Sequence, residues 1–160
     1  MTITFIGHGY VGLVTASVFA DLGNKVWVIG HTKEKIENLK KGIIPIYEPG
    51  LAEIVERNIK AKRLLFTLDY KEAIPESKIV FIAVGTPPKE NGEADLSVVL
   101  DVAKKIAKHL GRYTVVVTKS TVPVGTYKKI KTIIKLNIKA GEARLSSPAA
   151  QAFDNQGGNN

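Results

Sequence analysis

The chain has 160 residues, enough for one domain of ordinary size but not for two. Apolar residues make up 44% and charged residues 24%, which excludes a disordered chain, a collagen-like chain and a disulfide-rich scaffold. Without cysteine there are no disulfides, thiolate metal sites or cysteine nucleophile. No apolar run is long enough to cross a bilayer and the first residues lack the basic segment of a signal peptide, so we expect a cytoplasmic protein with no membrane partner.

The net charge of +8 is unevenly distributed along the chain. Between Val102 and Gly141 there are nine lysines and one arginine but no acidic residue. Such a basic region favours an anionic partner, although most lysines of this kind belong to solvated helix faces. The aromatic residues needed to stack bases do not alternate with these lysines, so we expect no nucleic-acid partner.

Strand and helix patterns alternate from the N-terminus onward. Residues 2–6 and 25–29 are short, mostly apolar runs typical of strands buried on both faces. Between them, residues 10–22 have helical spacing, and Gly23 ends this helix. Its expected buried side consists of Val11, Val14, Val18 and Leu22, with the small Ala16 and Ala20 nearby.

The middle of the chain continues this alternation. The predicted elements are a helix (33–41), a loop with two prolines (43–50), a helix (51–61), a strand (64–68) and a strand (78–84). Before the last of these, Asp69 with Glu72 three residues later is similar to a capping box that begins a short helix ended by Pro75.

The remaining elements complete an α/β pattern. Asp95 caps a helix, residues 113–118 form a strand rich in β-branched residues, and residues 126–136 form a helix. The helix after Asp95 is expected to bury Val98, Val99, Val102, Ile106 and Leu110, and the last helix Ile130, Ile133 and Ile134. Alternating strands and helices imply right-handed crossovers, so we predict a single doubly wound domain with a parallel, Rossmann-like sheet.

We assign residues 1–140 to this domain. Residues 141–160 contain five Asn or Gln and three Gly, with no helical or strand period. We expect residues 141–160 to be an irregular or disordered tail.

Residues 7–12, Gly-His-Gly-Tyr-Val-Gly, match the pattern G-x-G-x-x-G between the first predicted strand and the first helix. In this context Gly7 permits the tight turn, Gly9 lets the backbone approach a pyrophosphate, and Gly12 lets helix and strand pack closely. The pyrophosphate would then meet the free N–H groups at the helix N-terminus. The alternative is an ordinary strand-to-helix turn without a ligand.

The end of the second strand bears on the choice of cofactor. In domains that bind NAD, an acid about 20 residues after the glycines binds the adenosine ribose. Here that position is Gly30, followed by His31, with Lys33 and Lys35 close behind. We therefore expect NAD as cofactor with weakened discrimination against NADP, because no carboxylate repels a 2′-phosphate and these basic residues could attract one. The alternative is that backbone and water alone hold the ribose.

Four segments together resemble a known family. They are residues 7–13, 46–51 (Ile-Tyr-Glu-Pro-Gly-Leu), 81–87 (Phe-Ile-Ala-Val-Gly-Thr-Pro) and 119–126 (Lys-Ser-Thr-Val-Pro-Val-Gly-Thr). Their sequences and order are similar to the N-terminal NAD-binding domain of the UDP-glucose/GDP-mannose dehydrogenase family. The resemblance extends from Met1 to about Lys139.

The resemblance implies a four-electron oxidation of the C6 alcohol of a nucleotide sugar to a carboxylate, with two hydride transfers to NAD. By motif, the expected cofactor contacts are Gly9, Tyr10, Val11 and Gly12 at the pyrophosphate, Lys35 near the adenosine ribose, Val84, Gly85 and Thr86 beside the riboses, and Ser120 and Thr121 at the nicotinamide. Thr121 would also position a catalytic water. Considered without the family, Gly85–Pro87 is a strand-ending turn, and Ser120 and Thr121 are caps of the following helix.

The chain also departs from the family. The covalent step of the family uses a cysteine, which this chain lacks. That cysteine, a catalytic lysine and most sugar contacts belong to a C-terminal half with no counterpart here, and Ala149 stands where the family has a catalytic glutamate. We therefore predict the cofactor-binding half of a nucleotide-sugar 6-dehydrogenase, inactive alone, that meets its nucleotide-sugar substrate only with the missing half. Apolar surface that this half would cover leaves self-association open.

The alternative function is a non-catalytic nucleotide-binding module whose basic face, within residues 104–139, binds a partner or an anion. His8 and His109 have no metal-ligand partners at usable spacing, so we predict no metal site and assign them no role. The loop around Tyr47 is expected to serve packing or an interface.

Overall fold

The computed structural model describes residues 1–138. The strands are β1 (Thr2–Ile6), β2 (Lys25–Ile29), β3 (Leu64–Thr67), β4 (Ile79–Ile82) and β5 (Val115–Thr118). The helices are α1 (Tyr10–Asp21), α2 (Lys33–Lys40), α3 (Leu51–Lys60), α4 (Tyr70–Ala73), α5 (Ser97–His109) and α6 (Thr126–Asn137). The tail predicted for residues 141–160, including Ala149, lies outside the described residues.

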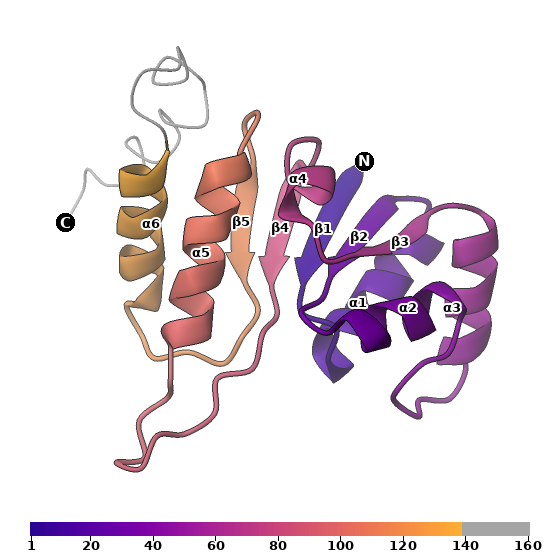
Figure 1. Cartoon of the computed structure of the whole chain (residues 1–160), viewed down its shortest axis with the longest axis horizontal. Helices are drawn as coiled ribbons and strands as arrows, with labels where there is room; N and C mark the ends of the chain where they lie inside the picture. Colours follow the sequence, from indigo (N-terminus) through magenta and orange to yellow (C-terminus); the bar gives the residue numbers. More distant parts are fainter. Residues whose placement is uncertain (139–160) are drawn as a thin grey trace.

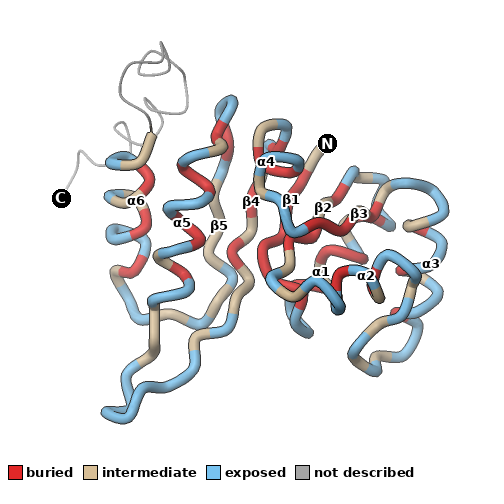
Figure 2. The backbone as a smooth tube through the Cα atoms, viewed as in Figure 1, coloured by how far each residue is buried: buried red, intermediate tan, exposed pale blue. Residues whose placement is uncertain are grey.

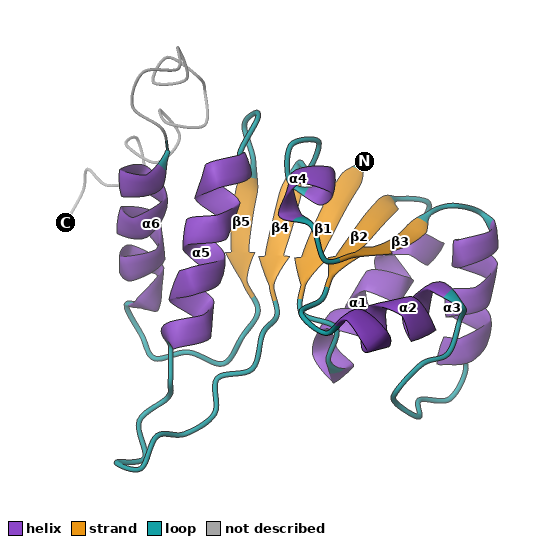
Figure 3. Cartoon of the chain, in the orientation of Figure 1, coloured by secondary structure: helices purple, strands orange, loops and turns teal. Residues whose placement is uncertain are grey.

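The strands form one parallel sheet in the order β3-β2-β1-β4-β5 (Figures 1 and 3). This arrangement confirms the predicted doubly wound α/β fold. The chain moves outward from β1 through β2 to β3, then crosses back to place β4 on the other side of β1. The carboxyl ends of β1 and β4 therefore lie side by side, at the arrowheads that form the lower ends of these strands in Figure 1. A topological switch point of this kind is where open α/β sheets bind ligands.

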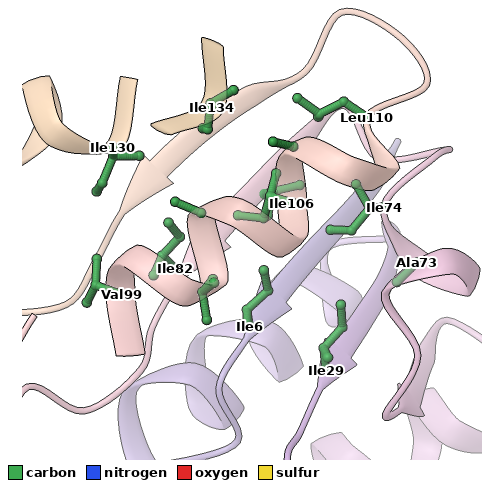
Figure 4. Packing of buried hydrophobic residues seen from close by; sticks show 14 residues of the cluster. Ile6, Ile29, Ala73, Ile74, Ile82, Val99, Ile106, Leu110, Ile130 and Ile134 are labelled. Atoms are coloured by element: carbon green, nitrogen blue, oxygen red, sulfur yellow. The ribbon is translucent and has the colours of Figure 1, made fainter. Parts of the chain in front are cut away.

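Each face of the sheet has its own apolar core. Helices α1, α2 and α3 cover one face, and α4, α5 and α6 cover the other. Successive residues of a strand point to opposite faces, so Phe5 of β1 belongs to the first core and Ile6 to the second. Figure 2 shows buried residues concentrated along the strands and the inner sides of the helices. In Figure 4, Ile6 and Ile82 from the sheet lie beneath Ile106 of α5.

The buried side predicted for α1 is wrong in part, because Ala16 and Ala20 are buried and Val14 is half-buried against the core, but the other three residues are not. Val11, Val18 and Leu22 are exposed. The buried residues of this helix are Gly12, Leu13, Ala16, Ser17 and Ala20. Because α1 is apolar on nearly every side, its hydrophobic period does not identify the face that meets the sheet. The small residues lie against the sheet because they allow the helix axis to approach it closely.

Two further local predictions need correction. Val98 of α5 is 46% exposed instead of buried, whereas Val99, Val102, Ile106 and Leu110 are buried as expected. At α4, the carboxylate of Asp69 accepts a hydrogen bond from the backbone N–H of Lys71, which is an N-terminal cap. Glu72 does not complete a capping box, because its carboxylate accepts from the hydroxyl of Thr67 and the N–H of Asp69 donates to that same hydroxyl oxygen.

Within residues 1–138, no helix combines the length and the apolar character needed to span a bilayer.

Candidate cofactor-binding site

The glycine loop turns the chain directly from β1 into α1 at the switch point. Gly7 has a φ of +115°, and a Cβ there would lie 2.3 Å from the carbonyl oxygen of Ala83, just after β4. A Cβ on Gly12 would lie 2.2 Å from the carbonyl oxygen of Gly7. Both positions therefore require glycine, as the sequence predicted, because any side chain would push helix, loop and strand apart.

Gly9, the middle glycine, faces open space. No atom of the described residues lies within 4 Å of the position that its Cβ would take. Gly9 is also the N-cap of α1, so the N–H groups of the first helical turn, from Tyr10 onward, have no partner within the helix. An anion placed beside Gly9 can approach the backbone and interact with these groups and with the positive end of the helix dipole.

One groove beside the glycine loop extends toward β4 and β5. It is lined by Gly9, Tyr10, Val11, Ala83, Val84, Gly85, Thr86, Lys119, Ser120 and Thr121. Eight of these ten residues belong to the set expected from the sequence to contact a cofactor. Residues more than one hundred positions apart in the chain thus line a single groove.

Hydrogen bonds join the loops after β4 and β5. The hydroxyl of Ser120 donates to the carbonyl oxygen of Val84 at 2.6 Å. The hydroxyl of Thr86 donates to the carbonyl oxygen of Thr121 at 2.7 Å. Helix α6 begins only at Thr126, so Ser120 and Thr121 are not its caps. The alternative of a simple helix cap is therefore excluded, and these side chains instead hold the two loops in a fixed relation.

A second pocket lies on the other side of the glycine loop. It is lined by Gly7, His8, Gly9, His31, Lys35, Pro45, Ile46, Ala83, Val84, Gly85 and Val98. Lys35, expected near the adenosine ribose, is among these residues. Val98 faces this pocket, which explains why it is exposed. The wall formed by Pro45 and Ile46 belongs to the proline loop, and the hydroxyl of Tyr10 donates a hydrogen bond to Glu48 of the same loop.

His8 has a position in this pocket that sequence spacing did not reveal. It is only 5% exposed, and its Nδ1 has no hydrogen-bond partner within the described part of the chain. Its ring centroid lies 4.9 Å from that of His31. Burial, and then the charges of His31 and Lys35, lower the pKa of His8. The signal available in the sequence was its place as the first variable residue of G-x-G-x-x-G, between the first strand and Gly9.

Gly30 lies against His8 at the carboxyl end of β2. A Cβ built on Gly30 would be 3.1 Å from Nδ1 of His8 and 2.5 Å from Cδ1 of Ile36. The space that an acidic side chain would take is therefore occupied by the buried side chain of Ile36 and bordered by the imidazole of His8, so that a side chain at residue 30 would require Ile36 to shift. No carboxylate from this position faces the pocket.

The remaining charged groups bear on two predictions, the absence of a metal site and the role of the basic region. Among the described residues no group of three or more His, Asp or Glu could hold a metal ion. In the basic region, Lys105 of α5 forms an ion pair with Asp101 at 2.8 Å, and its Nζ lies 5.8 Å from the ring centroid of Tyr70. Lys89 and Lys129 line a separate groove near the N-terminal ends of α5 and α6.

Comparison of this amino-acid sequence with those of known proteins identifies its relatives. Residues 1–150 match the profile of the UDP-glucose/GDP-mannose dehydrogenase family, NAD-binding domain. The chain is 52% identical over 144 residues to the UDP-glucose 6-dehydrogenase TuaD of Bacillus subtilis, an alignment that covers 90% of this chain and 31% of the relative. It is 50% identical over 148 residues to a UDP-glucose 6-dehydrogenase of Rhizobium meliloti, covering 92% and 34%. The chain thus spans about a third of the length of these relatives.

Solved structures show the same fold. A GDP-mannose dehydrogenase from Pseudomonas aeruginosa, determined as a ternary complex, superposes with a TM-score of 0.82 at 34% identity, covering 86% of this chain and 32% of the other. A UDP-glucose dehydrogenase from the archaeon Pyrobaculum islandicum gives a TM-score of 0.82 at 38% identity, covering 86% and 33%. The resemblance inferred from the four sequence segments and the predicted fold class are both confirmed.

Proposed function

Because the chain belongs to the UDP-glucose/GDP-mannose dehydrogenase family and spans its NAD-binding domain, we propose that it binds the dinucleotide that accepts hydride during oxidation of a nucleotide sugar. The observation that carries this proposal is the glycine loop at the switch point, where Gly7 and Gly12 exclude side chains and Gly9 leaves open space. This loop can receive a pyrophosphate without rearrangement.

The two pockets that flank the glycine loop suggest how the cofactor lies. The pyrophosphate would contact Gly9, Tyr10, Val11 and Gly12 at the start of α1. The adenosine half would occupy the pocket lined by His31 and Lys35. The nicotinamide half would occupy the groove lined by Val84, Gly85, Thr86, Ser120 and Thr121. We assign Thr121 the further role of positioning a water near the nicotinamide, since it is exposed at that end of the groove.

The complete reaction requires more than these residues. The names of the relatives indicate UDP-glucose or GDP-mannose as substrates, and for this protein we propose a nucleotide sugar oxidised at C6 from alcohol to carboxylate, with two hydride transfers. A covalent intermediate on sulfur needs a cysteine from outside these 160 residues, because they contain none. We therefore propose that this chain alone binds cofactor without turning over substrate.

Three finer proposals accompany this assignment. Gly30 offers no carboxylate to repel a 2′-phosphate, so we propose weakened discrimination against NADP. We propose a cytoplasmic location and residues 1–140 as the extent of the domain. Apolar side chains exposed on and next to α6, at Val124, Tyr127 and Leu136, favour association with a second copy or with another chain.

Calorimetric titration of the 160-residue chain with NAD tests the cofactor proposal. We expect saturable binding and a rise in melting temperature. Gly9→Ala is the informative variant, because its Cβ meets no atom of the described residues and yet occupies the proposed pyrophosphate space. Gly9→Ala should unfold like the wild type without cofactor and bind NAD much more weakly. No heat and no change in melting temperature at saturating NAD would refute the proposal.

A second measurement tests whether the chain is inactive alone. With NAD and UDP-glucose present, the absorbance of reduced nicotinamide should not rise. Steady turnover by this chain would contradict the argument from cysteine.

A further inference from the structure

One hydrogen bond connects the proline loop, residues 43–50, to the beginning of α1. The hydroxyl of Tyr10, the first residue of this helix, donates to Oε2 of Glu48. Within the described part of the chain, no other side-chain hydrogen bond involves residues 43–50. The two partners are 38 positions apart in the sequence, so the contact exists only in the folded chain.

The backbone of this loop is bonded near its two ends and not between them. The N–H of Ile43 donates to the carbonyl oxygen of Asn38 in α2, and the N–H of Leu51 donates to that of Glu48. Residues 44–47 form no backbone hydrogen bond with any described residue. The middle of the loop therefore depends on side-chain contacts for its position.

Prolines and isoleucines restrict the conformations open to the loop. The rings of Pro45 and Pro49 fix the φ angles of these residues, which leaves fewer conformations to the segment between them. Ile44 and Ile46 are partly buried against the core beneath α1, α2 and α3. In a segment restricted in this way, one additional hydrogen bond can select a single position, because it has little conformational entropy to overcome.

The position of the loop determines the shape of the adenosine pocket. Pro45 and Ile46 line this pocket together with Gly9, and Val98 lines it from α5. Glu48 is not among the lining residues and instead borders a hollow on the outer side of the loop. A substitution of Glu48 therefore leaves the lining of the pocket unchanged and acts on it through the loop.

We propose that Glu48 is a positioning residue for cofactor binding. By accepting the hydrogen bond of Tyr10, it holds the proline loop where Pro45 and Ile46 form a wall of the adenosine pocket. This inference rests on the proposed dinucleotide binding and adds to it a residue that does not touch the cofactor. Because Tyr10 belongs to the helical turn at which the pyrophosphate would bind, the bond fixes the pocket wall relative to that turn.

The phenol of Tyr10 is suited to this role at neutral pH. Its hydrogen bond to Glu48 raises the pKa of Tyr10 above the ordinary value of 10.0, so the hydroxyl keeps its proton and remains a donor. A carboxylate acceptor makes the bond charge-assisted. Since Tyr10 is 53% exposed, water competes for both partners, and we expect a small but measurable effect on binding.

Calorimetric titration of the 160-residue chain with 5′-AMP tests this role with two variants of equal charge. Glu48→Gln retains an oxygen that can accept from Tyr10, whereas Glu48→Ala removes the acceptor. Both variants lose the same negative charge, so a difference between them does not arise from attraction of the anionic ligand. Glu48→Ala should bind 5′-AMP about threefold more weakly than Glu48→Gln, because a smaller fraction of molecules then has the loop in the binding position. The same ratio is expected for NAD.

A double-mutant cycle shows whether this effect passes through the phenol. Tyr10→Phe keeps the ring and removes the hydroxyl. In that background, Glu48→Ala and Glu48→Gln should bind 5′-AMP equally. The matched control is Tyr47→Phe, which removes a hydroxyl from the loop itself at a position that is 90% exposed, and it should bind like the wild type. Urea denaturation without ligand should give the same stability for Glu48→Ala and Glu48→Gln.

Each result supports or overturns the role of Glu48. If Glu48→Ala and Glu48→Gln bind 5′-AMP equally in the wild-type background, the role is refuted while dinucleotide binding stands. If their difference persists in Tyr10→Phe, the effect does not pass through the phenol and the proposal is wrong. A loss of stability in Glu48→Ala that accounts for its loss of affinity would leave Glu48 a structural role alone. If the wild-type chain binds neither 5′-AMP nor NAD, the proposed function fails and this inference fails with it.

Discussion

The two sides of the glycine loop differ in how their polar groups are satisfied. On the side of β4 and β5, the hydroxyls of Ser120 and Thr86 donate to carbonyl oxygens of the opposite loop, at Val84 and Thr121. On the side of β2 and α2, Nδ1 of His8 is buried without a partner in the described part of the chain. The proposed nicotinamide side is thus held in shape by its own bonds, whereas the proposed adenosine side contains a buried polar group without such a bond in the described part of the chain.

The difference has a physical cause. Strands β4 and β5 end next to each other, so two loops with free backbone carbonyls meet and require donors. Strand β2 ends at Ile29, and Gly30 directly after it has no side chain to offer its neighbour His8. The surface is therefore fixed in shape where polar groups bond to one another within the chain. Where a polar group has no such partner, it can favour one ligand over another.

The largest effect on stability and cofactor binding should come from a side chain at Gly12, where α1 approaches the glycine loop between the two sides. Gly12→Val places a side chain where even a Cβ would lie 2.2 Å from the carbonyl oxygen of Gly7. We expect a loss of about 3 kcal/mol in the free energy of unfolding, measured by urea denaturation, together with loss of NAD binding. The control on the same helix is Val18→Ala, an exposed position that should change stability by less than about 0.5 kcal/mol. Wild-type stability of Gly12→Val would contradict the described packing.

The second largest effect should be a change in the relative affinity for NADP and NAD, caused by a substitution on the adenosine side alone. Gly30→Asp supplies the carboxylate that this position lacks, and Ile36→Ala is combined with it because the new Cβ would otherwise lie 2.5 and 2.6 Å from Cδ1 and Cγ1 of Ile36. We expect the affinity for NADP to fall roughly tenfold or more while that for NAD is retained, because the carboxylate repels a 2′-phosphate and accepts from a ribose hydroxyl. Titration of both cofactors measures this ratio, with Ile36→Ala alone as the control. An unchanged ratio would mean that residue 30 does not face the ribose.

A smaller effect on stability and on NAD affinity should follow from a substitution on the nicotinamide side alone. Ser120→Ala removes the donor to the carbonyl oxygen of Val84 and should cost about 1 kcal/mol of stability. Because the loops after β4 and β5 would then be less fixed, NAD should bind more weakly, while 5′-AMP should bind as to the wild type. Ser120→Thr keeps the hydroxyl and serves as the control. Equal losses for NAD and 5′-AMP would show that the two sides are not independent.

The smallest effect concerns the core beneath α5 and appears only in alkaline solution. Burial raises the pKa of Tyr70 to about 12 from its ordinary value of 10.0. Since the unfolded chain loses this proton first, stability is full below about pH 10 and falls as the pH rises toward 12. Tyr70→Phe should remove this part of the pH dependence, measured by denaturant unfolding across that range. Tyr47→Phe, at a position that is 90% exposed, is the matched control, and identical curves for the two variants would exclude a special role for Tyr70.

Much of the fold could be predicted from local patterns. Short apolar or β-branched runs identified all five strands, and the positions of Gly7 and Gly12 between the first strand and helix identified the glycine turn. The same residue-level patterns placed Ser120 and Thr121 at a strand end. These features are readable because they depend on neighbours in the chain.

Other features were not readable in this way. The hydrophobic period of α1 pointed to Val11 and Val18, but the helix buries Leu13 together with its small residues. Val98 fits an apolar helix stripe, yet it faces the pocket. His8 had no partner at any useful spacing, because its neighbours His31 and Lys35 follow a whole helix and strand later.

The amino-acid sequence by itself determined the alternation of strands and helices, the glycine turn and the membership of a family, since these depend on local backbone preference and on short motifs. Only the tertiary structure decided which face of α1 meets the sheet and that His8, His31 and Lys35 line one pocket. The physical reason is that close packing and ligand pockets are set by distances between segments, which hydrophobic periodicity along one segment does not encode.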